Sequence, residues 1–213
     1  MREGGPAAPR IHPTAIVEEG VALGSGTAIW DNVHVRGPCT IGRECIVGEK
    51  TYIAYGVTVG DFVKINAHVY ICTGVTIEDR VFIAAGVIFT NDRNPRAFAD
   101  GYEGLAPSDP NEDTLRSWVR MGATIGAGAI IGPGLEIGRY AMIGMGSVVV
   151  SDVPPHGLVY GTPARLRGWV CMCGTPLREV RPGDGNLSDA CVRCGRRYAL
   201  TDAAAGLALT ARD

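Results

Sequence analysis

Four cysteines near the end of the chain have the spacing of metal ligands. One residue separates Cys171 from Cys173, two residues separate Cys191 from Cys194, and a glycine follows each pair. Two such knuckles supply four thiolates, the donor set of a tetrahedral zinc ion. The sequence therefore predicts a structural Zn²⁺ site, because four thiolates leave no coordination position open for catalysis. A ribbon that has lost its metal and thiol redox chemistry are the alternatives.

A second set of polar residues gathers around residues 91–118, a stretch rich in proline, glycine and charge. The set contains an imidazole, two amides, a hydroxyl, a carboxylate and a guanidinium, carried by His68, Asn66, Asn91, Thr73, Asp92 and Arg96. A neutral imidazole can take a proton from a substrate, so His68 is the candidate general base or substrate contact. The alternatives are a solvated surface histidine, and a role for Asn91 and Asp92 in capping the turn where the chain departs.

A six-residue repeat must position these side chains. A large apolar side chain occurs at every sixth position from Ile11 to Phe89, and again in the same phase from Val119 to Val149. This spacing fits neither a helix nor an alternating strand and is typical of a hexapeptide β-helix. The same phase places Cys39 and Cys45 in small inward positions and Cys72 on the surface side of its hexad.

Three hexads close one triangular coil. Glycines recur every eighteen residues, at Gly24, Gly42 and Gly60, and twenty hexads make between six and seven coils. Residues eighteen apart should therefore lie in one column, one coil from each other, as expected for Thr73 and Asn91. The same arithmetic stacks a histidine on two tyrosines, His34, Tyr52 and Tyr70. Because one hexad cannot bury its apolar residue alone, stability is shared between stacked coils.

The chain divides into four parts. Residues 1–10 are expected to be a flexible arm, residues 11–170 a β-helix domain that extrudes residues 91–118 as a loop, residues 171–200 a zinc-ribbon-like element and residues 201–213 a tail. A loop this long inside a regular solenoid is more often functional than neutral. Proline cannot donate to a strand ladder, so Pro154 and Pro155 are expected to end the solenoid.

The composition excludes several classes of partner. The net charge of the 213 residues is −2, so we expect neither a nucleic-acid-binding face nor a polybasic membrane patch. Apolar stretches are interrupted before they reach about 18 residues, so no transmembrane span is expected. The first ten residues lack the apolar run of a signal peptide, which makes the cytoplasm the expected compartment.

Several segments resemble one family. They read IHPTAIVEEG, AIWDNVHV, VFIAAGVIFTNDRNPRA, GATIGAGAIIGPGLEIG and DVPPHGLVYGTPARLRGW. They are similar to the nucleotide-linked 3-amino-sugar N-acetyltransferases of the left-handed β-helix, hexapeptide-repeat acyltransferase superfamily, over residues 11–170. The resemblance implies an all-β, left-handed parallel β-helix, a homotrimer, and active sites in clefts between neighbouring subunits. It also implies acetyl transfer from acetyl-CoA to the amine of a sugar attached to a nucleoside diphosphate.

The resemblance also implies roles for single residues. Asn91 matches the asparagine of the family's FTN motif and would contact the sugar's amino group, followed by Asp92 as in members that read FTND. Where many members carry an acidic residue one coil earlier, this chain has Thr73, so His68 would take the ammonium proton instead. The candidate substrate contacts are His34, Asn66, Thr73 and Arg96.

The implied reaction is direct attack of the amine on the thioester, without an acyl-enzyme. Positioning supplies most of the acceleration, and backbone amides near the cleft stabilise the oxyanion. The pantetheine arm of CoA is expected along the later coils, where Ala127, Gly128 and Met145 keep the walls low, with Arg165 as a phosphate contact.

Three rival functions remain open or are disfavoured. The γ-class carbonic anhydrases share this prism but bind zinc through three histidines, two of them five residues apart. The only histidines here are His12, His34, His68 and His156, with no such pair. A non-catalytic trimeric scaffold, and an acetyltransferase acting on a hydroxyl, an antibiotic or another amine, are the remaining alternatives.

Overall fold

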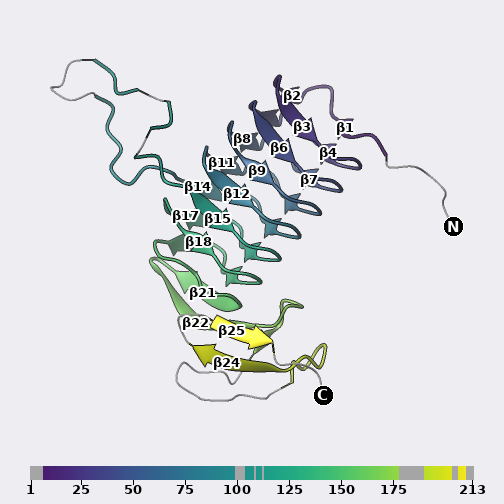
Figure 1. Cartoon of the computed structure of the whole chain (residues 1–213), viewed down its shortest axis with the longest axis vertical. Coiled ribbons are helices and arrows are strands. Elements are labelled where there is room, and N and C mark those ends of the chain that lie inside the picture. Colours follow the sequence, from purple (N-terminus) through teal and green to yellow (C-terminus); the bar gives the residue numbers. More distant parts are fainter. Residues whose placement is uncertain are drawn as a thin grey trace.

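The computed structural model describes residues 7–98, 104–107, 109–111, 113–177, 190–202 and 206–209. Within these ranges the chain forms short strands and turns and no helix, so no described helix is long and apolar enough to cross a membrane. The strands wind into a column with three faces (Figure 1). The fold is the expected left-handed parallel β-helix.

Each face is a parallel sheet with one strand per coil. Face A contains β1 (Arg10–Ile11), β4 (Ala28–Ile29), β7 (Ile46–Val47), β10 (Lys64–Ile65), β13 (Phe82–Ile83), β16 (Thr124–Ile125) and β19 (Met142–Ile143). Face B contains β2 (Ile16–Val17), β5 (His34–Val35), β8 (Tyr52–Ile53), β11 (Tyr70–Ile71), β14 (Ile88–Phe89), β17 (Ile130–Ile131) and β20 (Val148–Val149). Face C contains β3 (Val21–Leu23), β6 (Cys39–Ile41), β9 (Thr58–Val59), β12 (Val75–Ile77), β15 (Ser117–Val119) and β18 (Glu136–Ile137).

The register confirms the eighteen-residue coil. Tyr70 pairs with Tyr52, and Ile71 pairs with Ile53, one coil earlier. The aliphatic residue of each hexad points inward, so that Ile53 and Ile71 are fully buried. The recurring glycines are needed where coils approach closely, because a Cβ on Gly42 would overlap the Gly60 carbonyl oxygen.

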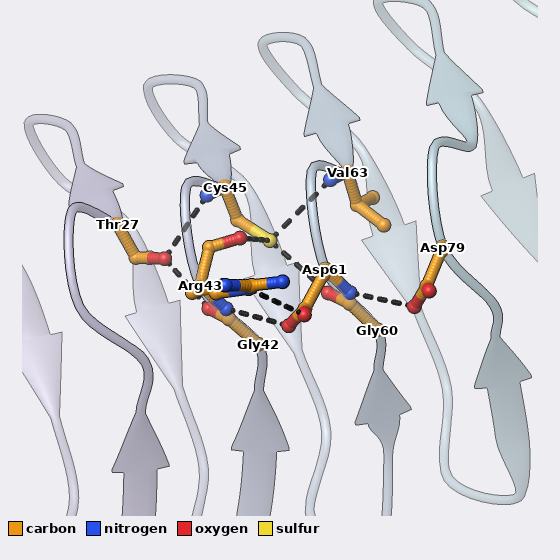
Figure 2. Close-up of polar contacts among 8 residues, drawn as sticks. All are labelled: Thr27, Gly42, Arg43, Cys45, Gly60, Asp61, Val63 and Asp79. Carbon is orange, nitrogen blue, oxygen red and sulfur yellow. Dashed lines mark hydrogen bonds and ion pairs between the residues drawn. The ribbon is translucent and has the colours of Figure 1, made fainter.

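A buried polar ladder aligns the coils at the corner between faces C and A (Figure 2). The Thr27 hydroxyl donates to the Gly42 carbonyl at 2.7 Å and accepts from the Cys45 amide at 3.0 Å. One coil later, the Cys45 thiol donates to the Gly60 carbonyl at 3.2 Å and accepts from the Val63 amide at 3.4 Å. Threonine and cysteine therefore perform the same backbone-bridging task, and Cys45 is inward as expected.

A charged ladder runs outside the buried one (Figure 2). The Asp61 carboxylate accepts from the Arg43 amide at 2.9 Å and from Arg43 Nε at 2.8 Å, while the Asp61 amide donates to Asp79 Oδ1 at 2.9 Å. These bonds, from the backbone of Arg43 first and its side chain second, lower the pKa of the Asp61 carboxyl. Each carboxylate thus satisfies the corner amide of the preceding coil.

The solenoid continues beyond the proline pair, so the expectation that Pro154 and Pro155 end it was wrong. Strand β21 (Gly157–Gly161) follows and pairs in parallel with β19, with Leu158 opposite Met142. Both prolines lie in the corner before the strand, where no ladder hydrogen bond is required of them. Strands β22 (Ala164–Val170) and β23 (Pro176–Leu177) then extend this sheet in antiparallel order.

The structure also differs from the boundaries expected for the N-terminal arm and the C-terminal tail. Arg10, placed in the arm, pairs with Ala28 in β1, while residues 1–6 lie outside the described residues. The expected tail contains strand residues, because β24 (Tyr198–Asp202) and β25 (Gly206–Leu209) form an antiparallel hairpin. Residues 203–205 and 210–213 of that tail, and residues 178–189 of the ribbon, lie outside the described residues.

The surface position expected for Cys72 was also wrong. Its side chain is only 4% exposed, while Cys39 is buried as expected. Cys72 directly follows the face-B strand β11, in the column of the buried Ala54, where the chain turns towards face C. Residues along a strand alternate between inside and outside, but at this corner Ile71 and Cys72 are consecutive and both are buried.

Candidate functional site

The long loop leaves the coil at one corner, between faces B and C. Its two ends are joined where the Leu115 amide donates to the Asn91 carbonyl at 2.8 Å, and the loop extends away from the column (Figure 1). The Asn91 side-chain amide donates to the Thr73 carbonyl at 3.3 Å, which confirms that these residues share a column. The Thr73 hydroxyl is itself engaged, because it donates to the Tyr55 carbonyl at 2.6 Å.

An open hollow of about 970 Å³ lies against the base of the loop. Residues of both charges line it, among them Thr73, Asn91, Asp92, Arg96, Asp109 and Asp113. Sequence reasoning missed Asp109 and Asp113, because nothing in their spacing shows that the loop folds back over Asn91. Residues 99–103, 108 and 112 of the loop lie outside the described residues.

The polar side chains of the hollow differ in how far they are engaged. Asp92 accepts the Asn94 amide at 2.8 Å in a local turn, which favours the capping role for its carboxylate. Arg96 is exposed, and among the residues that the structure describes it donates only to the neighbouring Pro95 carbonyl, at 2.9 Å. Among the described residues, Asn91 Oδ1 has no hydrogen-bond donor. This amide oxygen is therefore available to a ligand.

Asn66 and His68 lie at a different corner, between faces A and B. His68 is exposed, with φ of 58°, and its amide donates to the Glu49 carbonyl at 2.9 Å. Within the described part of the chain, its ring makes no hydrogen bond or ion pair. The backbone of Asn66 joins neighbouring coils, accepting from the Thr51 hydroxyl at 3.0 Å and donating to the Ile83 carbonyl at 2.8 Å.

The polar residues expected to form one cluster therefore lie in two groups, Asn91 with Thr73 and Asn66 with His68, which we call the two half-sites. His68 and Thr73 belong to one coil but flank face B, with strand β11 between them. The two residues lie at opposite edges of face B, and an extended chain of five residues between them spans at most about 17 Å. One copy of the chain does not bring the imidazole of His68 to the amide of Asn91.

The His68 corner carries a strip of backbone without side chains in three successive coils, which we call the furrow. In the next three coils the corner position of His68 is taken by Gly86, Gly128 and Gly146, which have φ of 71°, 68° and 65°. We call these four residues the glycine corner. Their amides bond the preceding coil, as where Gly128 donates to the Ala85 carbonyl at 2.9 Å. A Cβ at Gly128 or Gly146 would meet no other atom within 4 Å, so the furrow is open to solvent.

Of the residues expected to hold CoA, Ala127, Gly128 and Met145 lie along this corner. Ala127 precedes Gly128, and Met145, which precedes Gly146, is 81% exposed. The Gly161 amide donates to the Ser147 hydroxyl at 3.2 Å, and Arg165 lies opposite Tyr160 in the β21–β22 pair. The hydrogen bond therefore joins the turn of the β21–β22 hairpin to the residue that follows Gly146. The corner is about 14 Å long from His68 to Gly146, three strand spacings.

Face B, between the two half-sites, carries an aromatic and aliphatic column. The Tyr52 and Tyr70 rings stack at 5.3 Å with an interplanar angle of 7°, and His34 meets Tyr52 edge-on at 5.5 Å, as the sequence predicted. His34 Nε2 lies 2.7 Å from Glu18 Oε1. This hydrogen bond holds the pKa of the Glu18 carboxyl below its usual value, against the opposing effect of burial. His34 thus belongs to the face and not to either half-site.

The four cysteines lie at the C-terminal end of the column. Their Sγ atoms all fall within 4.8 Å of one another. The four cysteines are far in sequence from the two half-sites and belong to a segment that follows the coils. None of them lines the hollow.

Comparison with known sequences agrees with the repeat. The family described as bacterial transferase hexapeptide (six repeats) matches residues 20–54 and 56–91, and the hexapeptide repeat of succinyl-transferase matches residues 38–72 and 122–151. A solved structure of a mutant AntD, an N-acyltransferase from Bacillus cereus in complex with dTDP and coenzyme A, covers 76% of this chain and 80% of that chain. Its TM-score is 0.44 at 21% identity, too low to compare sites.

Curated relatives are acetyltransferases. A dTDP-3-amino-3,6-dideoxy-alpha-D-galactopyranose 3-N-acetyltransferase of Aneurinibacillus thermoaerophilus is 44% identical over 87 residues, 41% of this chain and 42% of that protein. Serine acetyltransferase 4 of Arabidopsis thaliana is 28% identical over 160 residues, 75% of this chain and 29% of that protein. The chain thus spans less than half the length of either relative. The chain therefore carries the hexapeptide repeat of bacterial transferases, and over part of its length it is similar to an amino-sugar N-acetyltransferase.

Proposed function

We propose that this protein is an acetyl-CoA-dependent N-acetyltransferase that acts, as a cytoplasmic homotrimer, on the amine of a nucleotide-linked amino-sugar. The observation that carries the proposal is Asn91 Oδ1 at the hollow, which accepts no hydrogen bond from the part of the chain that the structure describes. Asn91 lies at the base of the loop, and its side-chain nitrogen donates a hydrogen bond to the Thr73 carbonyl. A fixed amide oxygen is suited to accept an N–H from the acceptor amine.

The glycine corner supports acetyl-CoA as the donor. A linear pantetheine arm can lie along bare backbone at Gly128 and Gly146, because no side chain fills that space. The amides of this corner already donate to the preceding coil, so the arm would pair through carbonyl groups, which can accept from its amides. The exposed Arg165 of the β21–β22 hairpin is the candidate contact for the CoA phosphates.

The two half-sites support the homotrimer. Face B exposes a line of apolar side chains, with Ile16, Tyr70, Ile88 and Ile130 exposed by 57%, 45%, 42% and 39%. Packing of neighbouring copies through this face covers that surface. It also carries the glycine corner of one copy towards the loop base of the next. The cleft between two copies then holds His68 from one chain and Asn91 from the other.

In this cleft the reaction is a direct transfer. The amine lone pair attacks the thioester carbonyl carbon, and the carbonyl π electrons move to its oxygen, which backbone amides stabilise. When the intermediate collapses, the C–S bond breaks and CoA leaves as a thiolate. The proton lost by the amine passes to His68 or to the CoA sulfur. Thr73 does not replace the missing carboxylate as a base, because a neutral hydroxyl is a much weaker proton acceptor, and its own proton is donated to the Tyr55 carbonyl.

The test is thiol release from acetyl-CoA, measured with purified protein and a panel of acceptors. The panel contains dTDP-, UDP- and GDP-linked amino-sugars, L-serine, and an aminoglycoside. We expect CoA release only with a nucleotide-linked amino-sugar, and a product heavier by one acetyl group on nitrogen. No release with any acceptor would favour the scaffold, and an acetylated protein formed without acceptor would contradict direct transfer.

A serine hydroxyl is the second candidate acceptor. The serine acetyltransferase of Arabidopsis thaliana matches 75% of this chain, a longer segment than the amino-sugar enzyme matches. That of Escherichia coli (strain K12) is 54% identical over 50 residues. Formation of O-acetylserine in the same panel, without acetylation of any sugar, would establish this alternative.

A further inference from the structure

The four cysteines form a cage of the size that zinc requires. Cys171 Sγ lies 3.4 Å from Cys194 Sγ, Cys173 Sγ lies 3.6 Å from Cys191 Sγ, and all four atoms are within 4.8 Å of one another. A tetrahedral zinc ion with Zn–S bonds of about 2.3 Å separates its sulfur ligands by about 3.8 Å. The thiols therefore need only small shifts to coordinate one ion.

The cage is assembled by two tight turns. The Gly174 amide donates to the Cys171 carbonyl, and the Gly195 amide to the Cys191 carbonyl, each at 2.8 Å. Both glycines have positive φ, 83° and 72°, which lets each chain reverse directly after its second cysteine. The turns direct two thiols from each segment towards one point.

Neighbouring groups are arranged to stabilise thiolates. Zinc with four thiolates carries a net charge of −2, and Arg196 Nη1 donates to Cys194 Sγ at 3.3 Å. The Tyr198 hydroxyl lies 3.0 Å from Cys171 Sγ and accepts from the Met172 amide at 2.9 Å. Hydrogen bonds of this kind orient metal ligands and offset their charge.

The same tyrosine connects the cage to the β-helix. Tyr198 is 2% exposed, and its ring lies 5.2 Å from the ring of His156, which in turn lies 5.3 Å from Tyr140 of the last coils. His156 Nδ1 lies 2.9 Å from the carbonyl of Val170, the residue before the first cysteine. The cysteine cage and the end of the column therefore form one packed unit.

From this geometry we propose that Cys171, Cys173, Cys191 and Cys194 bind one Zn²⁺, which fixes the C-terminal segment over the last coil. The ion has four thiolate ligands and no open position, so its role is structural. It joins two segments that are seventeen residues apart in sequence, and so holds Tyr198 against His156. In this arrangement β22 and β23 cover the edge of β21, the last parallel strand of the column.

The first test is the metal content of the intact protein. Full-length protein from zinc-supplemented cells, purified without chelators, should contain one zinc per chain by elemental analysis, and C171S or C194S should contain less than one fifth of that. The matched control is C72A, at a buried cysteine of the coil, which should keep its zinc. Cobalt added to the demetallated wild type should give the absorption bands of a tetrahedral tetrathiolate centre.

Three results would overturn the site: wild-type protein without zinc that also fails to bind cobalt, an iron centre, or a disulfide among these cysteines in freshly purified protein. The cobalt spectrum uses wild-type protein, so it decides the matter even where a cysteine variant fails to fold.

The second test addresses the fixing of the segment. Zinc is removed from wild-type protein with a mercurial reagent that is then displaced by excess thiol, and hydrogen exchange is compared with that of the zinc form. We expect at least tenfold faster exchange in residues 169–177 and 190–202 and unchanged exchange in β7 to β17. Equal exchange in both forms would show that the metal does not hold the segment. Y198F should keep zinc but exchange faster in residues 169–173.

Discussion

At the scale of single residues, the acceptor site depends on how Asn91 is held. Its side-chain nitrogen donates to the Thr73 carbonyl and its backbone carbonyl accepts from the Leu115 amide, while Oδ1 accepts no hydrogen bond from any described residue. The amide therefore cannot rotate freely, and its oxygen is presented in one direction. A preset acceptor of this kind costs little to reorganise when substrate binds.

We expect N91A to lower kcat/KM for the amino-sugar by roughly 10- to 100-fold, because a hydrogen bond to a reacting amine contributes about 1.5–3 kcal/mol. Steady-state kinetics with varied sugar and saturating acetyl-CoA measure this loss. T58A, an exposed threonine on face C, is the control and should retain wild-type rates. An N91A enzyme as active as wild type would remove Asn91 from the site.

At the scale of structural elements, face B separates the glycine corner, our proposed donor site, from the base of the loop, our proposed acceptor site. G128L should fill the furrow and impose a side chain on a residue with φ of 68°. We expect the KM for acetyl-CoA to rise by about tenfold or more with the KM for the sugar nearly unchanged, because only the donor half of the cleft is altered.

The control for backbone strain is G20L, at a residue with φ of 82° at another corner. It should destabilise the protein by about 1 kcal/mol without changing either KM. If G128L and G20L affected acetyl-CoA binding equally, the furrow would not be the donor site.

A charged cluster stabilises the coil where the chain returns from the loop. Arg120 donates to Glu78 at 2.9 Å and to Glu136 at 2.8 Å, across three successive coils of face C. The hydrogen bond from Arg120 lowers the pKa of Glu136, and that of Glu78 is lowered by the same guanidinium although burial opposes it. Groups with a depressed folded-state pKa stabilise the fold above their unfolded pKa and lose this contribution as pH falls through the folded value.

R120M should therefore reduce stability most at neutral pH, by about 1 kcal/mol for the exposed pairs, and progressively less below about pH 4. Thermal melts of R120M and wild type at pH 7 and pH 3.5 measure the two differences. R116M, at an exposed arginine beside the loop, should melt like wild type at both values. An equal loss at both pH values would mean that packing, not charge, is responsible.

At the scale of the whole molecule, the proposed reaction needs two copies, because one chain places His68 and Asn91 at opposite edges of face B. We expect I88D to dissociate the trimer and abolish transfer, because a charge in the apolar column of face B opposes its burial between copies. Light scattering should give one third of the wild-type mass. I46D changes an isoleucine of equal exposure, 41% against 42%, but on face A, and should leave a trimer. A trimeric I88D would place the interface elsewhere.

The period of the sequence was sufficient to predict columns. The hydrogen bond between Asn91 and Thr73 and the stack of His34, Tyr52 and Tyr70 follow from a difference of eighteen, since neighbouring coils share every strand position. The period did not show which corner each column occupies. Two residues five apart, such as His68 and Thr73, must flank one face, and this requires the faces to be assigned as well as the coils.

The least predictable parts lie outside the repeat. Leu115 and the acidic residues of the hollow follow no period, so only the folded loop shows that they meet Asn91. Strand β21 follows a proline pair that reads as a stop, because sequence does not show that both prolines fall in a corner. The cysteine cage was predictable from spacing, whereas its contact with His156 through Tyr198 was not.

The single hydrogen bond between the Asn91 carbonyl and the Leu115 amide has a consequence for how the family can diversify. It holds both ends of the loop at one corner. The stacking of the coils before and after the loop therefore does not depend on the number of residues in the loop. The loop of residues 91–118 can therefore be lengthened, shortened or exchanged without a change to the furrow at the other edge of face B. New acceptors can thus be acquired without rebuilding the donor half.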